Sequence, residues 1–137
     1  MSDDVLVNKS ATIERCVKRA REEYAAATDF ASDVTRQDAA ILNIQRACEA
    51  ALDMGQYIIR RERLGVPQSA RDVFALMAKN GWVPSPLATS LQNMVGFRNI
   101  AVHDYQALQM PIVVAIITRH LDEFLDYSRH LLKRDSA

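Results

Sequence analysis

Two long stretches of this chain repeat apolar residues every three or four positions, which is the period of a helix that buries one face. In the first, from about residue 4 to about residue 30, charged side chains fill the other face, and the apolar positions are Leu6, Ile13, Val17, Ala20, Tyr24 and Ala27. A helix of this length spans roughly 35–40 Å. Helices this long are typical of bundles.

The second stretch lies between a start and a stop signal. It follows a polar break at residues 33–38, and its apolar positions are Ile41, Ile44, Cys48, Ala51, Leu52, Ile58 and Ile59. Arginines at residues 60–63 suit the negative end of a helix dipole, and Gly65 and Pro67 then stop the helix. These arginines form either a solvated helix end or a rim that contacts phosphate.

Three further helices are predicted from capping signals and spacing. Ser69 is expected to cap a short helix with the acidic Asp72 in its first turn, and Ser85 to cap the next, with Pro86 as its first residue. The last helix runs from about residue 111 to about residue 133. Its expected core stripe is Ile112, Ala115 or Ile116, His120 or Leu121, Phe124, Leu125 and Leu131 or Leu132.

The fold class follows from these patterns and from the scarcity of helix breakers. Only 4 Gly and 4 Pro occur in 137 residues, and no alternating strand pattern and no internal repeat is present. Short loops between long helices place neighbours antiparallel. The sequence therefore predicts an all-α, antiparallel up-and-down bundle of four to five helices, forming one domain over residues 1–137.

Charge and cysteine content restrict the possible environment. The formal net charge is +0, so any nucleic-acid contact must come from a local basic cluster. Cys16 and Cys48 are isolated within helical patterns, which suggests reduced, buried thiols. The acidic N-terminus is followed by no long apolar run, and the most apolar segment, residues 110–118, is too short to span a bilayer. We therefore expect a cytoplasmic protein without membrane association.

His120 and Glu123 are one helical turn apart and could present two metal ligands on one face. A di-metal bundle needs a Glu-x-x-His element on each of two helices, but the chain has 3 His and no second element. We expect a surface pair or a half-buried core histidine instead, with no metal and no other cofactor.

The richest concentration of functional side chains is at residues 96–105. Cleavage of RNA without a metal requires a base for the ribose 2′-hydroxyl, an acid for the leaving oxygen and a cation for the phosphate. Histidine can serve as a base or an acid near neutral pH and arginine offers a forked cation, so His103 and Arg98 are the candidate catalytic pair. Asn99 and Asp104 are candidates to hold the histidine ring or the helix end by hydrogen bonds.

The spacing of this pair imposes a geometric condition. On a regular helix, positions five apart differ by about 140° around the axis. For both to line one cleft, the helix must end or distort between Asn99 and Val102, or a second subunit must complete the cleft, and we expect some of each. In the alternative interpretation, Arg98 caps carbonyls, His103 fills a gap and Tyr105 packs with its hydroxyl in water.

This segment resembles the signature of the HEPN superfamily, an arginine, a polar residue, spacers and a histidine: Arg98-Asn99-Ile100-Ala101-Val102-His103. The resemblance covers nearly the whole chain. Within the superfamily, the chain resembles HepT-like toxins most, and these are encoded beside a minimal nucleotidyltransferase (MNT) antitoxin. In that family the motif continues as Arg-x4-His-x-Tyr, and Tyr105 stands at the tyrosine position.

The resemblance implies a homodimer of HEPN-like bundles in which the two motifs face each other across the two-fold axis. Arg98 and His103 would be the ribonuclease residues, Asn99 would support them, and the substrate would be an RNA such as tRNA or mRNA. Tyr105 would accept AMP from ATP, transferred by the MNT partner. The added anionic group would then repel the RNA phosphate.

Two alternative functions stay open. In one, a non-catalytic HEPN module that binds a nucleotide or forms a dimer uses Arg98 and His103 only to hold a phosphate. In the other, a helical subunit only binds the nucleotidyltransferase. An intact pair favours catalysis, because a binding module has less need of a side chain that titrates near neutrality.

Overall fold

The computed structural model describes residues 3–137. Met1 and Ser2, with which the predicted domain and its acidic N-terminus begin, lie outside the described residues. The described part contains six α-helices, two short 3₁₀ turns and no strand, so the all-α prediction is confirmed and the count of four to five helices is wrong. In chain order the elements are α1 (Asp4–Ala26), η1 (Phe30–Ser32), α2 (Val34–Glu62), α3 (Ala70–Lys79), α4 (Ser85–His103), η2 (Tyr105–Ala107), α5 (Met110–Arg119) and α6 (Leu121–Ser136).

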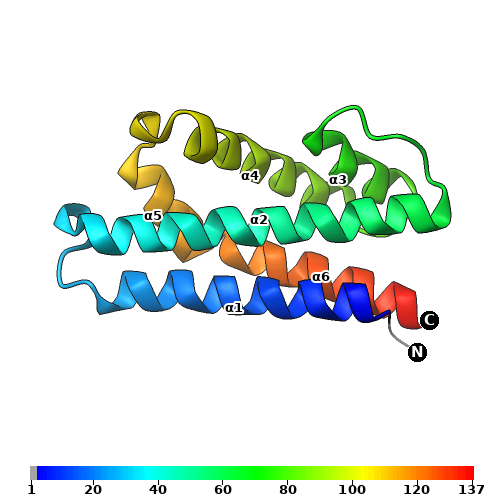
Figure 1. The fold of residues 1–137 in the computed structure, drawn as a ribbon, viewed down its shortest axis with the longest axis horizontal. Helices are drawn as coiled ribbons and strands as arrows, with labels where there is room; N and C mark the ends of the chain where they lie inside the picture. The colour runs from blue at the N-terminus through cyan, green and yellow to red at the C-terminus, as the bar shows by residue number, and fades with distance from the viewer. Residues whose placement is uncertain (1–2) are drawn as a thin grey trace.

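The two longest helices, α1 and α2, lie antiparallel along the molecule (Figure 1). Helix α6 runs antiparallel to α1, and α3 and α4 pack along α2, with α4 running back toward the start of α2. The described chain begins and ends at the same end of the bundle, whereas η2 and α5 lie at the opposite end. The up-and-down arrangement expected from short connections is therefore present.

The break between α1 and α2 falls earlier than the sequence predicted. Helix α1 ends at Ala26 rather than near residue 30, and α2 begins at Val34, so the predicted polar break at residues 33–38 is wrong. The reason is that the Asp33 carboxylate accepts the Arg36 N–H at 3.0 Å. This side-chain cap starts the helix while its first turn is still polar.

The caps of α3 and α4 differ in how well they were predicted. Ser69 caps α3 as expected, its hydroxyl oxygen accepting the Asp72 N–H. Ser85 is not a cap, because the Pro84 carbonyl already accepts the Ala88 N–H at 3.1 Å. Helix α4 therefore begins one residue earlier than predicted.

The predicted last helix is broken into α5 and α6 at His120, whose φ is −122°. No Gly or Pro marks this break, and the apolar spacing from Ile117 to Leu121 and Phe124 continues across it. The break changes the direction of the chain. As a result, α6 packs antiparallel to α1, whereas α5 lies near the end of α4 (Figure 1). Tertiary packing decides it, because the local pattern is that of an uninterrupted helix.

One buried core runs through all six helices and confirms the predicted stripes of α1 and α2, except that Tyr24 and Ala27 are only partly buried. Cys16 and Cys48 are buried and free, as expected. At the break in the last helix, Leu121 is buried and His120 exposed. Ile112 was expected in the core and is 50% exposed, which is an error of the assumed helix register. Nothing in residues 3–137 forms a helix long and apolar enough to cross a membrane.

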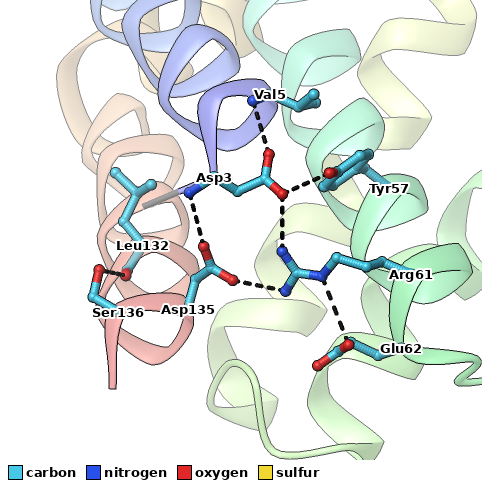
Figure 2. Close-up of polar contacts among 8 residues, drawn as sticks. All are labelled: Asp3, Val5, Tyr57, Arg61, Glu62, Leu132, Asp135 and Ser136. Atoms are coloured by element: carbon cyan, nitrogen blue, oxygen red, sulfur yellow. Dashed lines mark hydrogen bonds and ion pairs between the residues drawn. The ribbon is translucent and has the colours of Figure 1, made fainter. Parts of the chain in front are cut away.

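The two ends of the described chain are joined by a network around Arg61 on α2 (Figure 2). Its guanidinium pairs with Asp135 at 2.7 Å and with Asp3 at 3.2 Å. The Tyr57 hydroxyl donates to Asp3 at 2.6 Å, and the Asp3 N–H donates to Asp135. Arg61 is thus a structural ion-pair residue, and the arginines at residues 60–63 are exposed at the end of α2, which agrees with the solvated helix end.

Replacing Tyr57 by phenylalanine should make the free energy of unfolding less dependent on pH in the acidic range. The Tyr57 hydroxyl bond is the largest cause that lowers the pKa of Asp3 below its ordinary 3.8, with help from Val5 and Arg61 and against partial burial. A lowered pKa stabilises the fold above the unfolded value and ceases to do so as pH falls through the folded value.

The urea midpoint of Tyr57→Phe should therefore fall below that of the wild type at about pH 7, and the difference should narrow at about pH 3. Phenylalanine keeps the ring beside the Arg61 guanidinium, 5.7 Å from the ring centroid. Tyr24→Phe, in which no side-chain hydrogen bond among residues 3–137 is lost, is the control. A gap that is the same at both pH values would contradict this assignment.

Candidate functional site

Arg98 and His103 lie on the last two turns of α4, which is regular through His103. The Asp104 N–H donates to the Ile100 carbonyl at 2.8 Å, so helical bonding continues past the motif. The predicted ending or distortion between Asn99 and Val102 is therefore wrong. Phe97 and Ala101 are buried at helical spacing and hold this segment against the core. The two catalytic candidates accordingly project about 140° apart around the helix axis.

The Arg98 side chain lies half-buried against α2. It lines a pocket of about 270 Å³ with residues of α2 and α3, here called the Arg98 pocket: Glu49, Leu52, Asp53, Gln56 and Ala70. Its Nε is buried without a hydrogen-bond partner, and the guanidinium forms no ion pair with any carboxylate in residues 3–137. Burial raises the pKa of the neighbouring Cys48 thiol to about 12, an effect that the Arg98 charge opposes. Arg98 is therefore a cation without an ion-pair partner in residues 3–137, although the Glu49 and Asp53 side chains line the same pocket.

His103 is exposed at the C-terminal turn of α4. Its imidazole makes no hydrogen bond and no ion pair with the described residues, so both ring nitrogens are open to a ligand. Asn99 and Asp104 are exposed beside it, and neither side chain is bonded to the histidine ring within residues 3–137. Their supporting roles stay predictions, and the fold holds Arg98 more tightly than His103.

Tyr105 opens η2, directly after the turn that ends α4, and it is 42% exposed. Its hydroxyl donates to an Asp38 carboxylate oxygen, so it does not point into water as the alternative interpretation supposed. Burial, followed by the hydrogen bond and charge of Asp38, raises the pKa of Tyr105 above its ordinary value. Sequence reasoning missed Asp38, because it lies 67 positions away in an ordinary amphipathic helix and carries no local signal.

An apolar groove of about 540 Å³ lies beside this end of α4, between α4 and α5. This α4–α5 groove is lined largely by Met94, Phe97, Ile100, Leu108, Pro111, Ile112 and Ile116. Ile100 and Ile112, which line this groove, are 41% and 50% exposed. Contiguous exposed apolar surface of this kind marks an interaction site.

His120 and Glu123 form the surface pair that the sequence allowed. The His120 Nδ1 lies 3.1 Å from both Glu123 carboxylate oxygens, at an exposed position beside the α4–α5 groove. In residues 3–137, no three His, Cys, Asp or Glu side chains gather in a way that could hold a metal ion.

An all-α bundle that carries Arg-x4-His-x-Tyr at the end of a long helix, with an arginine and a histidine that form no ion pair within residues 3–137, has the features of a HEPN domain. A family model described as "Ribonuclease HepT-like" matches residues 13–131. The chain belongs to this HepT-like family, which confirms the resemblance stated from the sequence.

Known proteins agree with this assignment in sequence and in fold. The mRNA nuclease HepT of Shewanella oneidensis is 49% identical over 122 residues, which cover 89% of this chain and 92% of that protein. A tri-AMPylated HEPN toxin of the same organism, solved in complex with an MNT antitoxin, is 46% identical with a TM-score of 0.90, covering 94% of this chain and 97% of that one. A toxin–antitoxin structure with AMP-PNP is also 46% identical with a TM-score of 0.90, covering 94% and 98%.

A more distant structure shows the fold alone. The cytosolic protein YutE of Bacillus subtilis, of unknown function, is 16% identical with a TM-score of 0.73, over 90% of this chain and 88% of that one. The bundle is therefore shared more widely than the sequence.

Proposed function

We propose that this chain, acting as one cytoplasmic domain over residues 1–137, is the ribonuclease toxin of a toxin–antitoxin pair. It cleaves RNA without a metal ion, and an MNT-type nucleotidyltransferase neutralises it by transferring AMP to Tyr105. Membership of the HepT-like family and the likeness to an mRNA nuclease and to a toxin bound by an MNT antitoxin support this. The observation that carries it is that Arg98 and His103, on the last two turns of α4, form no ion pair with any carboxylate of residues 3–137.

The chemistry divides between the two side chains. A ring nitrogen of His103 takes the proton from a ribose 2′-hydroxyl, or gives a proton to the leaving 5′-oxygen, as the phosphodiester bond breaks. The Arg98 guanidinium donates to the phosphate oxygens on which negative charge grows. Asn99 and Asp104 support the pair by polar contacts with RNA or with a partner chain.

A homodimer completes the cleft in this proposal. Because Arg98 and His103 project about 140° apart on one regular helix, a single chain directs them to different faces. A two-fold axis beside the end of α4 would bring the His103 of one copy to the Arg98 of the other. The exposed apolar side chains around the α4–α5 groove support such a contact. Doubling the pair also concentrates positive charge locally in a chain whose net charge is +0.

Modification of Tyr105 would act through charge and bulk. Tyr105 stands two residues after His103 and is 42% exposed, so a partner enzyme has access to it. An adenylyl group adds a phosphodiester anion and a nucleoside next to the proposed cleft. It repels the RNA phosphate and fills the space that the RNA backbone needs.

Cleavage of RNA in the presence of excess EDTA tests the proposed reaction. The purified chain should cut tRNA or mRNA at the same rate in EDTA and in Mg²⁺, because its own side chains supply the acid, the base and the cation. Activity that EDTA abolishes and Mg²⁺ restores would contradict the metal-free reaction. If a folded dimer cut no RNA in either buffer, the non-catalytic nucleotide-binding function would replace this one.

A further inference from the structure

Asp38 faces the reacting group of Tyr105 although the two are far apart in sequence. Because α4 runs antiparallel to α2, its end comes to lie near the start of α2, where Asp38 stands on the second turn (Figure 1). The Tyr105 hydroxyl donates to Asp38 Oδ1, and no other side-chain hydrogen bond of either residue exists within residues 3–137. The structure thus supplies one carboxylate for one phenol.

We propose that Asp38 is a catalytic residue in the adenylylation of Tyr105, accepting the phenolic proton as the hydroxyl attacks phosphorus. This inference rests on the proposed function, in which Tyr105 is the acceptor of AMP. It assigns to the toxin chain a base that works on a substrate held by its partner. The toxin is then not merely the acceptor in its own inactivation.

The need for such a base follows from the state of the phenol. Burial and the neighbouring Asp38 charge raise the pKa of Tyr105, so its hydroxyl is protonated at neutral pH. A neutral phenol is a weak nucleophile, and its proton becomes acidic only while the oxygen bonds to phosphorus. A carboxylate already hydrogen-bonded to that proton can take it at this moment without moving.

The step balances as a displacement at the α-phosphorus of a nucleoside triphosphate bound by the nucleotidyltransferase. The bond from the Tyr105 oxygen to the α-phosphorus forms, and the bond from that phosphorus to the bridging oxygen of the β-phosphate breaks. Pyrophosphate leaves with the electron pair of the broken bond. The phenolic proton passes to Asp38 and then to water.

The surroundings of Asp38 suit this role better than those of nearby carboxylates. Asp38 forms no ion pair with a lysine or arginine of residues 3–137, so no cation competes for its lone pairs. Asp33 is committed to capping α2 and Glu23 is paired with Arg36. Asp38 is also exposed, so the partner's bound nucleotide can approach the Tyr105 hydroxyl without unfolding this end of the bundle.

The test is the rate of AMP incorporation from labelled ATP into the purified chain by its MNT-type nucleotidyltransferase partner. Asp38→Asn keeps the shape and a hydrogen-bond acceptor but removes the base, so kcat should fall about 100-fold while KM for the chain changes little. Asp38→Ala should be as slow as Asp38→Asn. Asp38→Glu restores a carboxylate and should recover part of the lost rate.

Two controls separate this inference from the proposed function. Asp122→Asn removes an exposed carboxylate of α6 that accepts from Arg21, and should react at the wild-type rate. Tyr105→Phe should take up no AMP. If Tyr105→Phe were still labelled, the proposed function and this inference would both be overturned. If Tyr105→Phe were unlabelled but Asp38→Asn reacted within about threefold of the wild type, a change far below that of losing a base, only the inference would be overturned.

Discussion

Replacing His103 by alanine should abolish RNA cleavage and leave a folded protein. Loss of a positioned acid or base costs about 10²–10⁴ in rate, and His103 is exposed with no partner in the described chain, so its removal disturbs no packing. Arg98→Ala should lose about 10²–10³ in rate, because the phosphate charge would have no fixed donor. Initial rates of cleavage on labelled RNA measure both effects, and thermal melts report the fold.

The controls for this prediction are matched in residue type. His130→Ala and Arg129→Ala remove an exposed histidine and an exposed arginine of α6 and should cut RNA at the wild-type rate. Arg98→Lys guards against a folding defect, since it keeps the charge but loses the fork, and it should remain far slower than the wild type. A His103→Ala protein that kept more than about a tenth of the activity would exclude His103 as the acid or base.

Mixing the two inactive proteins tests where the pair is assembled. If Arg98 of one copy works with His103 of the other, a heterodimer of Arg98→Ala and His103→Ala contains one intact pair, since each chain supplies what the other lacks. The mixture should therefore regain activity. If both residues of one chain worked together, every pair in the mixture would lack one member, and no activity would return.

The second large effect is expected at Gly55, where α2 meets α3 and α6. A Cβ added there would lie 2.5 Å from Val73 Cγ1 and 2.7 Å from the Tyr127 hydroxyl oxygen, and neither of these side chains is exposed. The Tyr127 hydroxyl donates to the Ala51 carbonyl at 2.9 Å, a buried bond that any displacement would break.

Gly55→Ala should therefore lower the free energy of unfolding by about 3 kcal/mol, since overpacking and a broken buried hydrogen bond outweigh the better helix propensity of alanine. Urea denaturation measures the change. Gly96→Ala on α4 is the control, because its Cβ would meet only the end of the flexible Arg71 side chain, 2.9 Å away. We expect Gly96→Ala to be neutral or slightly stabilising. Equal midpoints for the two variants would contradict the close approach at Gly55.

Sequence patterns within one or two helical turns were enough to predict most of the fold. Apolar spacing identified the buried faces of α1 and α2, and the Ser69 cap was readable, because both depend only on neighbours along the chain. The break at His120 could not be predicted from the sequence, because Ile117, Leu121 and Phe124 keep helical spacing across it. Which way a long helix must turn depends on the helices it packs against.

The candidate site divides in the same way. The motif from Arg98 to Tyr105 is continuous in sequence, so its residue types and its HEPN resemblance could be recognised without a structure. The regular course of α4 could not be recognised in the same way. Because the helix is regular, Arg98 and His103 point to two faces of one chain instead of being brought together by the expected distortion.

The sequence by itself thus determined the helices, their buried faces and the local set of reactive side chains, because each depends on spacing along one helix. Only the tertiary structure decided what these side chains meet. It placed Arg98 against α2 with no ion pair among the described residues, and it brought Asp38 to the Tyr105 hydroxyl across 67 positions. Such contacts arise from the antiparallel packing of α2 and α4, and local periodicity holds no information about them.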